Sequence, residues 1–195
     1  MSKLMISLLA AVGIAFAGAA GAADTKTMSR DAYKADQDRV EAQYKADKER
    51  CSSMTGNAKD VCQAEAKGKE KVAKAELEAN YKNTDKARND ARVAKADADY
   101  DVAKEKCDDL SGNQKDVCVK QAKAAHTQAK AGAKVAKVDQ KTSASTADKR
   151  ADVRREARDD TRDAQYKVAL EKCDAMSGAA KDQCVKDAKM HYGKT

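Results

Sequence analysis

A motif of two cysteines with ten residues between them occurs three times in this chain and constrains its fold more than any other feature. The three copies read "ERCSSMTGNAKDVC", "EKCDDLSGNQKDVC" and "EKCDAMSGAAKDQC", each with a glycine between the cysteines. Their first cysteines are Cys51, Cys107 and Cys173, so the second interval is longer than the first. This recurrence indicates one supersecondary unit used three times, with the extra residues of the second interval in a connector.

The residues before each motif have the spacing of a narrow helix-packing stripe, with alternating steps of four and three. In the first copy the stripe consists of Tyr33, Gln37, Val40, Tyr44, Asp47, Cys51 and Met54. The composition agrees, because Ala, Lys, Glu, Gln and Arg favour helices and the chain has no proline. Low hydrophobicity with high charge also allows disorder, but a disordered chain has no reason to keep a tyrosine seven residues before each first cysteine.

Small residues follow the central glycine and predict a face that lets two helices approach closely. The second copy shows this face as Cys118, Ala122, Ala125, Ala129, Gly132 and Ala136. We expect the glycine to end the incoming helix in the left-handed conformation, and Asn57 or Asn113 to cap the outgoing one. In the third copy Ala179 replaces the asparagine, so that cap is weaker or shifts to Ser177.

These patterns predict an all-α fold of three tandem antiparallel helical hairpins with coiled-coil-like packing, each stapled by one Cys-x10-Cys disulfide. Helices are expected at 27–54, 58–82, 85–110, 114–137, 147–176 and 180–191. The predicted units are a signal peptide at 1–23, hairpins at 24–83, 84–137 and 147–195, and a flexible linker at 138–146. The "NTD" turn separates the first two hairpins, with Thr84 or Asp85 as the cap of the next helix.

The first residues have the layout of a secretory signal peptide, in which Lys3 precedes an apolar run that ends in small residues near Ala23. An uncleaved membrane anchor is the alternative, because the run is about as long as the roughly 20 residues of a spanning helix. Cleavage after Ala23 removes only the charge of Lys3 from a net charge of +7, so the exported part stays basic. We therefore expect a periplasmic protein without a transmembrane segment after cleavage.

The even number of cysteines in an exported chain indicates a disulfide framework, although six cysteines allow 15 pairings. Geometry favours local bonds, because a disulfide needs Cα atoms roughly 4.4 to 6.8 Å apart. Eleven steps along one continuous helix would span about 16 Å, whereas a hairpin brings the two positions together. We predict three bonds: Cys51 to Cys62, Cys107 to Cys118 and Cys173 to Cys184.

Other chemistry has weaker support in the sequence. A redox enzyme would favour Cys-x-x-Cys at a helix start, and structural zinc uses closely spaced ligand pairs, neither of which fits a spacing of ten. His126 and His191 stand at different places in their copies and have no ligand spacing. We expect no catalytic residue, no cofactor and no metal, so the protein is not predicted to be an enzyme.

The densest basic run contains Arg150, Arg154, Arg155, Arg158 and Arg162 among almost as many acids. Pairs such as Asp152 with Arg155 and Asp159 with Arg162 favour a solvated helix face over a polyanion site, and no specific nucleic acid is expected. The basic balance still leaves attraction to anionic envelope polymers open. A further repeated set, Tyr44, Tyr100 and Tyr166, is expected to anchor the helix seams.

The run "YKADKERC…GNAKDVC…AEAKGKEKVAKAELEA" and the Ala-, Lys-, Asp- and Glu-rich helices resemble small periplasmic helical proteins of Gram-negative proteobacteria labelled TolA-like or cell-envelope biogenesis proteins. The resemblance implies a periplasmic helical protein associated with envelope integrity. Its specific part is the cysteine repeat, while the likeness to TolA itself is one of stalk composition.

We therefore expect a non-catalytic structural or interaction protein of the cell envelope, with another envelope protein or an anionic envelope polymer as partner. An oligomer is possible. The alternative is a periplasmic ligand-binding or stress protein that sequesters a metal ion or an anionic envelope polymer.

Overall fold

The computed structural model describes residues 28–140 and 147–194, and these residues form helices without any strand. The helices are α1 (Arg30–Ser52), α2 (Gly56–Lys82), α3 (Asp85–Cys107), α4 (Gly112–Asp139), α5 (Ala147–Cys173) and α6 (Gly178–Tyr192). The predicted signal peptide at 1–23 lies outside the described residues, as do positions 141–146 of the predicted linker. The first two residues of that linker, at 138–139, belong to α4.

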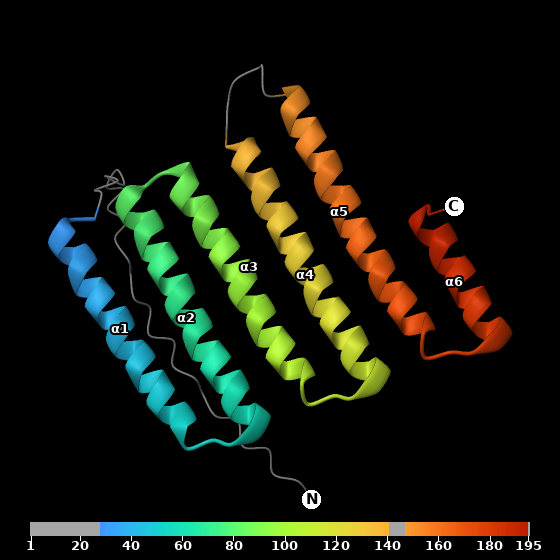
Figure 1. The fold of residues 1–195 in the computed structure, drawn as a ribbon. Coiled ribbons are helices and arrows are strands. Elements are labelled where there is room, and N and C mark those ends of the chain that lie inside the picture. The colour runs from blue at the N-terminus through green and yellow to red at the C-terminus, as the bar shows by residue number, and fades with distance from the viewer. Residues whose placement is uncertain (1–27, 141–146, 195) are drawn as a thin grey trace, which may run out of the picture.

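The helices lie side by side in a single layer and alternate in direction (Figure 1). The three cysteine-containing bends, α1 to α2, α3 to α4 and α5 to α6, all lie at one edge of this layer. Packing follows chain order and is most extensive between α2 and α3 and between α4 and α5. The helices therefore pack continuously from one predicted hairpin to the next.

Small side chains fill the seams between the helices. The buried apolar residues of the described chain are eleven alanines, Leu77 and the cysteines Cys51, Cys107 and Cys173. Gly68 shows how tight a seam is, because a Cβ atom at this position would lie 3.2 Å from the Cβ of Ala98 on α3. The layer is thus held by close backbone approach rather than by a thick core.

The incoming helices end two or three residues before the predicted positions 54, 110 and 176. At each bend the third residue after the cysteine donates its amide to the cysteine carbonyl, as Met54 does to Cys51 at 3.1 Å. This tight turn ends the helix at the disulfide. As a result Met54 is 41% exposed, and the prediction that it continues the packing stripe is wrong. The equivalent Leu110 and Met176 are 39% and 47% exposed.

The predicted glycine conformation is confirmed, but its place differs from the prediction. Gly56, Gly112 and Gly178 have φ between 54° and 57° and open the outgoing helices, after the incoming helices have already ended. The extended residue before each glycine occupies the N-cap position without a side-chain hydrogen bond. The prediction that asparagines cap these helices is therefore wrong, whereas Thr84 caps α3 by accepting from the Ala87 amide at 3.2 Å.

The predicted small-residue face of α4 is only partly correct. Ala122 is buried, but Ala125, Ala129 and Gly132 are exposed on one face of the layer. The buried residues further along α4 are Ala131 and Ala133. The reason is that α4 packs against α3 on one side and α5 on the other, so its contacts follow two stripes instead of one.

All three predicted disulfides are present. The Cα atoms are 5.6, 5.6 and 5.7 Å apart in the Cys51–Cys62, Cys107–Cys118 and Cys173–Cys184 bonds. The fold is thus the predicted all-α chain of hairpins, each tied at its bend. Within the described ranges, no helix has the length and apolar character needed to cross a membrane.

Candidate functional site

Each disulfide joins a buried sulfur to a more accessible one. Cys51 and Cys107 are 0% exposed and Cys173 is 1% exposed, whereas their partners on the outgoing helices are only half-buried. No cysteine is left as a free thiol. The bonds therefore close the edge of each seam, and their position is that of a structural staple.

Two of the three repeated tyrosines contact an equivalent position on the outgoing helix. Tyr100 stacks on His126 with ring centroids 4.8 Å apart, and Tyr166 packs on Tyr192 at 6.0 Å. In the first repeat the position equivalent to His126 and Tyr192 is Glu70, and the ring of Tyr44 has the Lys48 ammonium 5.5 Å from its centroid. In the first hairpin the aromatic stack lies further from the bend, where the Tyr33 and Tyr81 ring centroids are 4.3 Å apart.

A polar cluster on α2, α3 and α4 surrounds Asp97. His126 Nε2 lies 2.7 Å from Asp97 Oδ1, and the ammonium groups of Lys71 and Lys130 lie 3.5 and 3.8 Å from the carboxylate. Burial by itself raises the pKa of Asp97, but the hydrogen bond from His126 and the two lysine charges outweigh it and lower this pKa. The cluster ties three helices together and was not identified from the sequence, because Asp97 is far along the chain from each of its partners.

Asp47 is the one buried carboxylate among the described residues. Its side chain accepts a hydrogen bond from Gln43 at 2.7 Å and is also paired with Arg50. The Gln43 hydrogen bond and the Arg50 charge outweigh burial and lower the pKa of Asp47. The sequence placed this carboxylate in the packing stripe, where the other two repeats have alanine at Ala103 and Ala169.

His191 is exposed on α6 and makes an edge-on ring contact with the neighbouring Tyr192, with centroids 4.7 Å apart. It is far along the chain from His126, and the two histidines belong to different helices. Within 28–140 and 147–194, no group of three or more His, Cys, Asp or Glu side chains could hold a metal ion.

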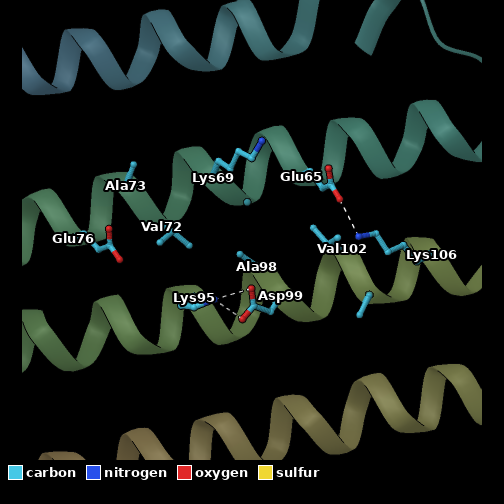
Figure 2. Close-up of a pocket in the computed structure, with 12 residues that line it drawn as sticks. Glu65, Lys69, Val72, Ala73, Glu76, Lys95, Ala98, Asp99, Val102 and Lys106 are labelled. Atoms are coloured by element: carbon cyan, nitrogen blue, oxygen red, sulfur yellow. Dashed lines mark hydrogen bonds and ion pairs between the residues drawn. The ribbon is translucent and has the colours of Figure 1, made fainter. Parts of the chain in front are cut away.

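A hollow of about 740 Å³ lies between α2 and α3 on one face of the layer (Figure 2). Val72 and Val102 lie over the seam near Gly68 and Ala98. Three lysines and three acids surround this apolar floor: Lys69, Lys95, Lys106, Glu65, Glu76 and Asp99. Two ion pairs match part of this charge, Lys106 with Glu65 at 2.9 Å and Lys95 with Asp99 at 2.8 Å.

The opposite face has its own hollow of about 790 Å³ across α1, α2 and α3. It is more polar and is lined by Tyr44 together with Lys48, Lys67, Lys71 and Lys104 and the acids Asp60, Asp101 and Glu105. Gly68 lines both hollows, because the layer is one helix thick at this point.

The arginines of α5 have different surroundings in the structure. Arg155 pairs with Asp152 and Arg162 pairs with Asp159, as the spacing predicts. Arg154, Arg158 and Arg162, however, share the lining of a hollow between α4 and α5. Their steps of four place them in one row along the helix.

No protein-family model, no curated protein and no solved structure matches this chain.

Proposed function

We propose that this chain is a non-catalytic interaction protein of the periplasm that is associated with the cell envelope. The observation that carries the proposal is the single layer of stapled helices, neither face of which is covered by another described helix (Figure 1). Hollows are present on each face, and none of them is filled by a second layer of described residues. A thin layer of this kind offers a large contact surface for little chain length.

The three disulfides support the proposed periplasmic location. Each of the three bonds closes a short loop and contributes about 3 kcal/mol in the chain-entropy model. Such bonds form and persist where thiols are oxidised. Together with the signal-peptide layout of segment 1–23 and the resemblance to TolA-like envelope proteins, they favour the periplasm.

The proposal is tested by site-specific photo-crosslinking in cells. A crosslinking residue at Val72, on the apolar hollow, is expected to form adducts with an envelope component. The same residue at Ala122, which is buried in a seam, serves as the control and should give none. Recovery of the chain with cytoplasmic proteins, or with its cysteines reduced, would contradict the proposal.

A second candidate is the binding of an anionic envelope polymer. The row of arginines between α4 and α5 favours this candidate, because it gives that hollow an excess of positive charge. The hollow between α2 and α3, in contrast, has as many acids as lysines.

A further inference from the structure

The hollow between α4 and α5 has a volume of about 500 Å³ and lies on the same face as the hollow between α2 and α3. Its charged side chains are Arg154, Arg158 and Arg162 from α5 and Asp139 from α4. A second hollow of about 440 Å³ continues along the same two helices to the bend and contains Lys172. The 18 steps from Arg154 to Lys172 correspond to about 27 Å of helix.

The repeat makes the two grooves directly comparable. Gln121, Gly132 and Gln165 occupy the positions at which the first groove has Glu65, Glu76 and Asp99. Every acid that lines the groove between α2 and α3 is therefore replaced by an uncharged residue between α4 and α5. The first groove has as many acids as lysines, whereas three arginines and one aspartate line the hollow of the second.

The arginines are only partly neutralised by their neighbours. Arg154 reaches Asp139 at 2.8 Å, and Arg162 reaches Asp159 on its own helix at 2.9 Å. Both pairs are about half exposed, so solvent screens them and they hold the arginines weakly. Arg158 has no ion pair within the part of the chain that the structure describes.

The opposite face of the same two helices is built differently. There Lys134 pairs with Glu156 at 3.2 Å, and Lys120 lies 3.6 Å from Glu171. These two lysines of α4 thus meet acids of α5 across the seam.

We propose that the groove between α4 and α5 binds an anionic polysaccharide. Guanidinium groups bind carboxylates or phosphates through two parallel hydrogen bonds. Between the charges, Gln128 and Gln165 present amide groups that suit sugar hydroxyls. Nucleic acid fits less well, because no aromatic side chain lines this groove for bases to stack on. An open groove of this length suits a polymer chain rather than a single small anion.

This inference rests on the proposed interaction role and specifies a partner for one face. Photo-crosslinking at Val72 reports on the separate groove between α2 and α3, so the proposed function can hold even where the polysaccharide proposal fails.

The test measures binding of the oxidised chain, after removal of the predicted signal peptide, to polygalacturonate, with neutral dextran and double-stranded DNA as comparison polymers. The triple variant R154Q/R158Q/R162Q is expected to bind polygalacturonate at least about tenfold more weakly. The control K34Q/K45Q/K123Q removes the same charge from exposed positions on α1 and α4 and should retain affinity within about twofold.

A second variant tests the missing acids without removing an arginine. Q121E/Q165E restores carboxylates at two positions where the first groove has them, with almost no change in side-chain size, and should also weaken binding. Helix content and the three disulfides are checked in every variant. Failure of the unchanged chain to bind polygalacturonate, equal loss in the two charge-matched triples, or tighter binding to DNA would each overturn the proposal.

Discussion

The last disulfide should control the folding of α6. This helix has 15 residues, and α5 is its only substantial packing partner among the described elements. Isolated helices of about 12 to 15 residues are marginal in water. Replacing Cys173 and Cys184 by alanine removes a loop closure worth about 3 kcal/mol, and each step of about 1.4 kcal/mol is a factor of ten in an equilibrium. We therefore expect α6 amides to exchange roughly a hundredfold faster, while α1 to α4 keep their protection.

Hydrogen exchange followed by mass spectrometry measures this effect directly. The matched control replaces Cys107 and Cys118 by alanine, which opens a loop of the same length. In that variant α4 still packs against α5, so its protection should fall by less than that of α6. The reasoning is refuted if α6 loses less than tenfold in protection, or if α4 in the control loses as much.

Further predictions concern side-chain contacts between helices. N113A removes the 2.9 Å hydrogen bond from the Asn113 amide to a carbonyl at the end of α5. Urea denaturation should therefore show a free energy of unfolding that is lower by about 1 kcal/mol. The Asn57 amide has no such bond, so N57A should leave this free energy unchanged. H126A should cost about 1 to 2 kcal/mol by the same measurement, because it removes the stack on Tyr100 and the carboxylate contact, and H126Y should recover part of this loss by restoring a ring. The pKa of Asp47 is lowered in the folded chain, so its ionised form adds stability above the unfolded pKa of about 4. This stability is lost as the pH falls through the folded pKa. The urea midpoint of D47A should therefore drop less on acidification than that of the unchanged chain.

The structure also explains a difference between the repeats that the sequence left open. Asn113 does not cap its own helix but donates to the Glu171 carbonyl of the next hairpin. The third repeat has Ala179 at this position. Asn113 thus serves contact between the second and third hairpins, whereas the equivalent Asn57 makes no such bond.

The sequence by itself determined the helices, the bends and the disulfide pairs. These are local features, because the spacing of Tyr, Cys and Ala fixes which residues share a helix face, and a bend within a short segment brings Cys107 to Cys118. The same information placed the arginine and aspartate pairs of α5 correctly, since residues three apart on a helix are neighbours.

Only the tertiary structure decided how the helices meet. A middle helix such as α4 has contacts on two sides, and its many alanines allow several stripes to pack, so the sequence predicted Ala125 and Ala129 in a seam where the structure buries Ala131 and Ala133. The groove between α4 and α5 depends on this choice, because it brings the arginine row of one repeat beside a face of another repeat whose one charged lining residue is Asp139. Contacts between helices are made by side chains that are far apart in the chain. The side chains of alanine-rich helices are small and alike, so the sequence pattern alone does not select one helix packing over another.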